Sequence, residues 1–304
     1  MLHILSARQF DAEQLNNFFD DTEALRDLAA SDPDQLSRLG AGAIAATLFY
    51  EASTRTRLSF ESAALRLGMG VISTENAALF SSAIKGESIE DTARVVGEYA
   101  STIIIRHKVN GMPEKAAAVS KVPIINAGDG TNEHPTQSLL DAYTIRREKG
   151  RLDGLNVVIG GDLKHGRTVR SLARVLSMYP GNKISFVSVD ELQIGDDITT
   201  HLHGTGTKYE KTDDMFGALH DADVVYWTRL QKERQADPSV ETGFVIDQAA
   251  LQVMKEDAII LHPLPRVGEI DPSIDGDPRA KYFEQAANGL HVRTALLKMV
   301  LESV

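Results

Sequence analysis

Cysteine is absent from this chain of 304 residues. Disulfide frameworks, zinc sites built on thiolates and cysteine nucleophiles are therefore excluded. Any reaction that the protein catalyses must use oxygen and nitrogen groups.

Long apolar runs are also missing. The longest, such as 103–105 and 258–261, are far shorter than the roughly 20 residues that cross a bilayer. The N-terminus lacks the basic segment and apolar core of a secretory signal. We therefore expect no membrane partner and a cytoplasmic location.

Basic residues are in the minority, with 32 Lys and Arg against 43 Asp and Glu, which gives a net charge of −11. Phosphate backbones and anionic membranes attract basic faces, so a nucleic-acid partner is not expected. The hydrophobic fraction of 42% and charged fraction of 25% are typical of folded globular proteins.

The length predicts two domains. Short apolar runs alternate with helical patterns on both sides of Gly150, which is typical of parallel sheets covered on both faces. We predict an α/β protein with two doubly wound parallel-sheet domains. Their boundaries are 1–134 and 150–288, with a linking helix at 135–149 and a C-terminal helix, about 289–304, packing back on the first domain. The pattern over 278–304 predicts a helix with a break near Asn288–Gly289. The polar residues of 190–222 predict surface loops or variable helices.

Basic side chains follow most of the predicted strands, although the protein as a whole is acidic. In open parallel sheets, ligands bind beyond the carboxyl ends of the strands. The pattern therefore predicts a small ligand with several negative charges.

Residues 53–57 (STRTR) lie between a predicted strand and a predicted helix. The first N–H groups of a helix lack partners within it, and the side chains of Ser53, Thr54, Arg55 and Thr56 add further donors suited to phosphate. The alternative is an ordinary Ser/Thr cap with solvated arginines. A Walker-type loop is absent, which disfavours nucleoside triphosphate hydrolysis.

His134 and Gln137 lie three residues apart at the start of a predicted helix. An imidazole and a primary amide at one point suit polarisation of a carbonyl and binding of an amide, as in acyl transfer. A histidine that satisfies a loop carbonyl is an equally weighted alternative. No H-E-x-x-H or similar spacing occurs, so we expect no metal site.

Two further segments suit an anion. Residues 160–168 fail the dinucleotide pattern G-x-G-x-x-G, so we expect no nucleotide cofactor, but Arg167 and Thr168 open a helix and suit a carboxylate. Arg229 and Gln231 lie two residues apart after a strand and are predicted to face the same way, unless Arg229 is simply solvated. Ser81 and Lys85 lie in a polar loop and are unremarkable alone.

Three motifs in series give the chain a resemblance to a known family. Residues 49–57 (FYEASTRTR), 134–137 (HPTQ) and 262–266 (HPLPR) resemble those of the aspartate/ornithine carbamoyltransferases. Residues 85–87, 126–130 and 161–168 extend the likeness over nearly the whole chain. Ornithine enzymes resemble this pattern but carry a cysteine where this chain has Pro263, so the resemblance favours the aspartate branch.

The resemblance implies a role for each candidate residue. Phosphate would be held by Ser53, Thr54, Arg55 and Thr56, with Arg106 spanning phosphate and carbonyl oxygen. His134 and Thr56 would polarise the carbonyl, and Gln137 with the backbone carbonyls of Leu264 and Pro265 would hold the carbamoyl NH₂. The carboxylates of aspartate would be bound by Arg167, Thr168, Arg229 and Gln231. Ser81 and Lys85 would reach the neighbouring subunit's site.

The implied reaction transfers a carbamoyl group from carbamoyl phosphate to the amine of L-aspartate, a step of pyrimidine biosynthesis that needs no cofactor. The first domain would bind carbamoyl phosphate and the second aspartate, in at least a homotrimer with shared active sites. A regulatory chain accompanies some relatives, and the sequence leaves that partner open. The alternatives are transfer to another amino acid and a non-catalytic anion-binding protein.

Overall fold

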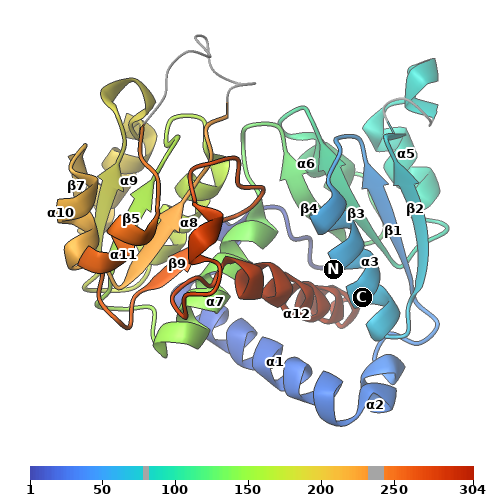
Figure 1. Ribbon diagram of the computed structural model, residues 1–304. Helices are drawn as coiled ribbons and strands as arrows, with labels where there is room; N and C mark the ends of the chain where they lie inside the picture. The colour runs from blue at the N-terminus through green and yellow to red at the C-terminus, as the bar shows by residue number, and fades with distance from the viewer. Residues whose placement is uncertain (78–81, 232–242) are drawn as a thin grey trace. The chain divides into compact units, whose positions relative to one another are not determined.

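The computed structural model describes residues 1–77, 82–231 and 243–304. The chain divides into two compact units, Met1–Leu139 with Asn288–Val304 and Leu140–Ala287. The division falls inside helices α7 (Pro135–Lys149) and α12 (Tyr282–Leu301), which are labelled in Figure 1.

The first unit is built on a parallel sheet with the strand order β2-β1-β3-β4. Its strands are β1 (Ile44–Phe49), β2 (Gly70–Glu75), β3 (Thr102–His107) and β4 (Ile124–Asp129). Its helices include α1 (Ala12–Ser31), α2 (Pro33–Arg38), α3 (Thr54–Arg66), α5 (Ile89–Val96) and α6 (Met112–Ala117). Strand β1 shows that both faces are covered: Thr47 bonds to Glu61 of α3, whereas Ala46 and Leu48 pack in the cluster that contains α5 and α6 residues.

The second unit contains a parallel sheet with the order β7-β6-β5-β8-β9. Its strands are β5 (Asn156–Gly160), β6 (Lys183–Val187), β7 (Lys208–Thr212), β8 (Val224–Trp227) and β9 (Ile259–Leu261). Its helices include α8 (Arg167–Leu176), α9 (Asp196–Thr205), α10 (Met215–His220) and α11 (Gln248–Val253). The predicted fold class, with two parallel-sheet α/β domains, is confirmed.

The C-terminal part of α12 packs on the first unit, as predicted. Arg26 Nη1 donates to Asn288 Oδ1 at 3.2 Å, and the guanidinium of Arg293 lies 5.2 Å from the centroid of the Phe60 ring. The predicted break near Asn288–Gly289 is wrong, because α12 is continuous through both residues. Asn288 is polar but buried, so its side chain marks a packing contact rather than a helix end.

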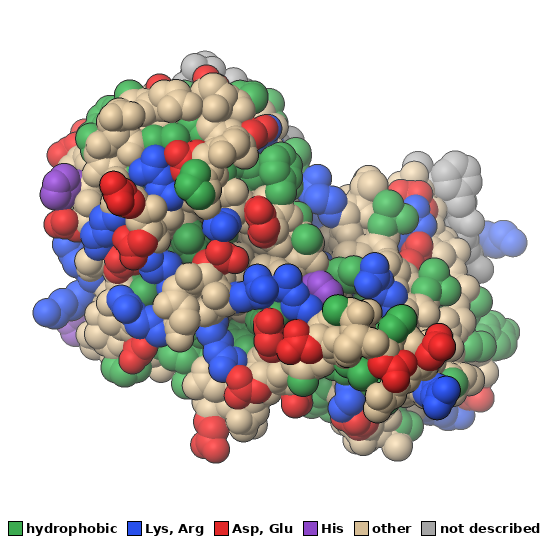
Figure 2. All heavy atoms as spheres, turned by 60° about the horizontal axis from the view of Figure 1, so that its bottom comes forward, with side chains coloured by type: hydrophobic (Ala, Val, Ile, Leu, Met, Phe, Trp, Pro, Cys, Tyr) green, Lys and Arg blue, Asp and Glu red, His purple; other side chains and the backbone are tan. Residues whose placement is uncertain are grey.

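Two edge strands, β2 and β7, were missed by the sequence prediction. Their residues are mostly exposed, so they lack the apolar alternation that indicates a strand. On the face shown in Figure 2, acidic and basic side chains are interspersed over the surface. None of the helices in the described ranges is both long and apolar enough to cross a bilayer.

Candidate functional site

The N-terminus of α3 lies at the carboxyl end of β1. Ser53 is the N-cap residue and has an extended backbone, but its side chain makes no capping hydrogen bond. The ordinary Ser cap, which was the alternative interpretation of this motif, is therefore not what the structure contains. The first turn of α3 carries no acidic side chain, so its partial positive charge is not offset there. This geometry suits an anion.

Arg55 and Arg106 bring two positive charges to this end of the sheet. The pKa of Arg55 is lowered, first by burial and then by the charge of Arg106. Repulsion between two guanidinium groups is relieved when an anion binds beside them. The pair therefore favours a ligand such as phosphate, whose oxygens accept from planar guanidinium groups.

Arg106, near the end of β3, is 7% exposed and is held on two sides. Its Nη1 donates to Ala127 O at 3.2 Å, and its Nη2 donates to Glu51 Oε1 at 3.0 Å. Glu51 was given no role by the sequence analysis, although it lies inside the first motif. It restricts the guanidinium to one orientation and partly offsets its charge.

His134 lies between two threonine hydroxyls. Its Nε2 is 3.5 Å from Thr56 Oγ1, and its Nδ1 is 3.5 Å from Thr136 Oγ1. The imidazole is 5% exposed. Thr56 and His134 are 78 positions apart in the chain and are brought together only by the sheet. Gln137 is half-buried in the first turn of α7, and its backbone N donates to His134 O at 2.9 Å.

Arg167 opens α8 in the second unit, after the N-cap Gly166, and the first turn again carries no acidic residue. Its side chain is buried. Thr168 is half-buried and hydrogen-bonds to Tyr226, whose hydroxyl donates to Asp141 Oδ2 at 2.8 Å. These contacts fix the beginning of α8 against β8.

Asp162 joins the segments that follow β5 and β8. It is fully buried and accepts from the backbone N of His165 at 3.0 Å and of Gln231 at 3.1 Å. Arg229 is half-buried, and its Nη1 donates to Leu230 O at 3.0 Å. Asp162 therefore brings the predicted Arg229–Gln231 segment to the loop that precedes Arg167.

His262 organises the segment that contains Leu264 and Pro265. Its Nδ1 accepts from Leu264 N at 2.8 Å, so the ring proton is on Nε2, which donates to Glu269 Oε1 at 2.7 Å. Burial opposes ionisation of Glu269, but the His262 bond and backbone N–H groups hold its pKa below the usual value. Leu264 has a φ of 53°, which turns the backbone sharply at this point.

The remaining predicted residues lie in the segment before α5. Lys85 is exposed at the end of the short helix Ser82–Lys85, whereas Ser81 lies outside the described residues. Across residues 1–77, 82–231 and 243–304, no group of three or more potential metal ligands is arranged to hold an ion.

Models of one protein family match both parts of the chain. The carbamoyl-P binding domain of the aspartate/ornithine carbamoyltransferases matches residues 2–147, and the Asp/Orn binding domain of the same family matches residues 153–300.

Individual relatives match over almost the whole chain. It is 48% identical to the chloroplastic aspartate carbamoyltransferase of Arabidopsis thaliana, over 98% of this chain and 77% of that protein. It is 44% identical to the aspartate carbamoyltransferase catalytic subunit of Clostridium novyi, over 98% and 97%.

Solved structures agree with these matches. The catalytic subunit of M. jannaschii aspartate transcarbamoylase has a TM-score of 0.92 at 43% identity and covers 100% of this chain and 99% of its own. The Trypanosoma cruzi enzyme in complex with carbamoyl phosphate and aspartate has a TM-score of 0.91 at 36% identity and covers 98% and 96%.

Proposed function

Because the chain belongs to the aspartate/ornithine carbamoyltransferase family, we propose that it transfers the carbamoyl group of carbamoyl phosphate to the amine of L-aspartate. The products are N-carbamoyl-L-aspartate and phosphate, as required in pyrimidine biosynthesis. The observation that carries the proposal is the placement of Arg55 and Arg106 at the N-terminus of α3, beside the Thr56–His134 pair. This placement supports a phosphate site next to a pair that polarises the carbonyl.

The first unit binds carbamoyl phosphate in this proposal. Ser53, Thr54, Arg55 and Thr56 hold the phosphate at the α3 N-terminus, where backbone N–H groups and the helix dipole favour an anion. Arg106 contacts both the phosphate and the carbonyl oxygen. His134 and Thr56 donate to that oxygen, and Gln137 accepts from the carbamoyl NH₂ together with the backbone carbonyls of Leu264 and Pro265.

The second unit binds aspartate. Arg167 and Arg229 pair with its two carboxylates, and Thr168 and Gln231 add hydrogen bonds. Two arginines and the N-terminus of α8 suit a dicarboxylate better than a diamino acid. The relatives named above that act on aspartate, and Pro263 where ornithine enzymes carry cysteine, support the same choice.

The chemistry needs no covalent intermediate on the enzyme. The neutral amine attacks the carbamoyl carbon, and negative charge develops on the carbonyl oxygen near Arg106, Thr56 and His134. The C–O bond to phosphate then breaks, and the amine proton passes to the departing phosphate. Donors aimed at such an oxyanion each contribute about 3–4 kcal/mol, and alignment of two reactants contributes about 7–11 kcal/mol in favourable systems.

Phosphate release from carbamoyl phosphate, measured with and without aspartate, tests the activity. We expect release that depends on aspartate and exceeds that with ornithine or other amino acids by orders of magnitude. Binding of both ligands without release would instead support a non-catalytic anion-binding protein, and preference for another amine would support a different carbamoyltransferase.

The assembly is proposed to be a homotrimer in which Ser81 and Lys85 complete the neighbouring subunit's site. If so, an Arg55→Ala chain and a Lys85→Ala chain, each nearly inactive alone, recover activity when they are unfolded together and refolded as mixed trimers. If light scattering shows trimers but the mixture is as inactive as each variant alone, the result would contradict shared sites. The cytoplasmic location stays a prediction that fractionation can test, and co-purification can show whether a regulatory chain accompanies this one.

A further inference from the structure

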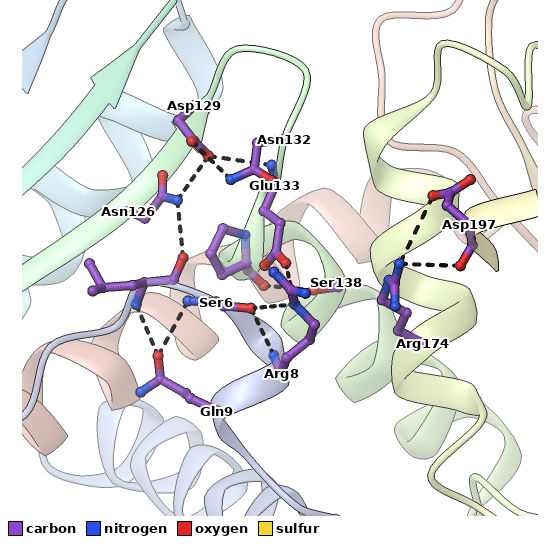
Figure 3. A network of polar contacts seen from close by, with 12 residues as sticks. Ser6, Arg8, Gln9, Asn126, Asp129, Asn132, Glu133, Ser138, Arg174 and Asp197 are labelled. Carbon is purple, nitrogen blue, oxygen red and sulfur yellow. Dashed lines mark hydrogen bonds and ion pairs between the residues drawn. The ribbon is translucent and has the colours of Figure 1, made fainter. Parts of the chain in front are cut away.

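Asp129 is the last residue of β4 and is fully buried. It had no role in the sequence analysis. Figure 3 shows its carboxylate facing Asn126 and the loop that contains Asn132 and Glu133. His134 follows this loop directly, so any contact that shapes the loop also sets the position of the imidazole.

The carboxylate accepts four hydrogen bonds. Its Oδ1 accepts from Asn126 Nδ2 at 3.1 Å and Glu133 N at 3.3 Å, and its Oδ2 accepts from Asn132 Nδ2 at 3.1 Å and Gly111 N at 2.8 Å. The backbone of Asp129 is tied to the same loop, since its N donates to Glu133 O at 3.1 Å and its O accepts from Asn132 N at 3.0 Å. Residues 129–133 therefore form a closed turn around one side chain.

The bond to Gly111 connects this turn to a second loop. Gly111 lies at the end of the segment that follows β3, and that strand contains Arg106. Gly130 N also donates to His107 O at 2.9 Å, and the pairing of β3 with β4 shifts register between Ile105 and His107. Asp129 thus links the segment after Arg106 to the segment before His134.

We propose that Asp129 is a positioning residue whose carboxylate sets the placement of Arg106 and His134 relative to each other. The inference rests on the proposed function, in which both side chains contact the same carbonyl oxygen. A displacement of about 1 Å between such groups can lower turnover about a hundredfold.

Residues of the N-terminal segment also contact Glu133 and Asn126, two neighbours of Asp129 (Figure 3). Arg8 Nε lies 2.7 Å from Glu133 Oε1, and Asn126 Nδ2 also donates to Leu5 O at 3.1 Å. Glu133 is buried, whereas Arg8 is about half exposed. An ion pair with one exposed partner contributes little, so Asp129 rather than Arg8 is the centre of the network.

Asp129→Asn tests the proposal because it keeps the shape of the side chain. One oxygen becomes an NH₂ group that cannot accept, so two of the four N–H donors lose their acceptor. The matched control is Asp223→Asn in the second unit. Asp223 is also buried, accepts from Asn156 N and Lys255 Nζ at 2.8 Å each, and precedes β8 at the opposite end of its sheet from the candidate residues.

Steady-state kinetics and NMR of the histidine rings are measured on wild type and both variants, well below their melting temperatures. The His134 ring signal is assigned by its absence in His134→Ala. For Asp129→Asn we expect kcat to fall about a hundredfold and the His134 ring nitrogens to shift, both free and with inorganic phosphate. For Asp223→Asn we expect a lower melting temperature, kcat within threefold of wild type and an unchanged His134 signal.

A kcat of Asp129→Asn within threefold of wild type, or an unchanged His134 ring signal, would overturn the proposal. If wild type itself releases no phosphate with aspartate, the proposed function fails, and the ring signals still decide whether Asp129 positions His134. The two failures are therefore distinguishable.

Discussion

Each unit has a buried aspartate at the carboxyl end of its sheet, on an edge strand in the first unit and after the central strand in the second. Asp129 is the last residue of β4 in the first unit and Asp162 follows β5 in the second, and both are fully buried acceptors of backbone N–H groups. Asp129 ties together loops next to Arg106 and His134, which act on the reacting carbonyl in the proposed mechanism. Asp162 ties Gln231 to the loop before Arg167, and both of these residues bind aspartate in the proposed function.

In the proposed mechanism, a buried carboxylate therefore serves the reaction in one unit and substrate recognition in the other. A buried carboxylate can hold two loops at the carboxyl end of a parallel sheet, because it accepts several N–H groups that the loops cannot satisfy internally. Substitutions in the two units should therefore have different effects on the kinetics. Changes in the first unit should lower turnover, whereas changes in the second should weaken aspartate binding.

The largest effect is expected for Arg55→Ala. Loss of the guanidinium removes a donor to the leaving phosphate, and we expect turnover to fall at least about a hundredfold with little change in melting temperature. The measurement is steady-state phosphate release at saturating substrates. Arg66→Ala, in the last turn of the same helix, is the control and should retain activity. Turnover of Arg55→Ala within a few-fold of wild type would refute this role.

Arg167→Gln should act on the other unit alone. A hydrogen bond between charged groups contributes about 1.5–3 kcal/mol, so KM for aspartate should rise about tenfold or more while KM for carbamoyl phosphate stays the same. Arg174→Gln is the control, because Arg174 lies further along α8 and its Nη2 contacts Asp197 (Figure 3). An equal rise for both substrates would contradict the separation of the two units' roles.

If the first unit binds carbamoyl phosphate and the second binds aspartate, the two ligands must approach each other during the reaction. Transfer requires the carbamoyl carbon and the aspartate nitrogen to come within bonding distance. An analogue with a phosphonate and a dicarboxylate end should therefore compact the protein in solution scattering. Phosphate alone, which occupies one unit, is the control. Scattering that is identical with and without the analogue would count against closure.

The smallest effect concerns stability, at Asp275 in the second unit. Hydrogen bonding and ion pairing with Arg266, together with a bond from Tyr282, lower the pKa of Asp275 to about 2. Its carboxylate therefore stabilises the folded state above pH 4, and this contribution is lost as the pH falls towards 2.

Asp275→Asn should accordingly lower the free energy of unfolding by up to about 1 kcal/mol at pH 6, since the pair is partly solvated. The difference from wild type should shrink by pH 3, which urea unfolding at the two pH values can measure. A difference that grew at the lower pH would show that the ion pair is not its source.

Prediction from the sequence succeeded where local pattern and local chemistry coincide. The buried strands β1, β3 and β8 are short apolar runs, and α7 covers the segment 135–149 that was predicted as the linking helix. It failed for β2 and β7, because their mostly exposed residues lack an apolar pattern and each strand is defined by pairing with a neighbour that is distant in the sequence. It also failed at Asn288, where a polar residue in a buried helix resembles a helix end.

The fold class, the family and the kinds of side chain at each strand end could be predicted from the sequence alone. Motif and composition suffice for these because they are properties of short segments. Which groups meet could be seen only in the folded chain: Thr56 contacts His134, Arg106 contacts Glu51, and Asp129 contacts Gly111. Such pairs are far apart in the chain, and the order of strands in the sheet, together with the register between them, sets the distance between their atoms.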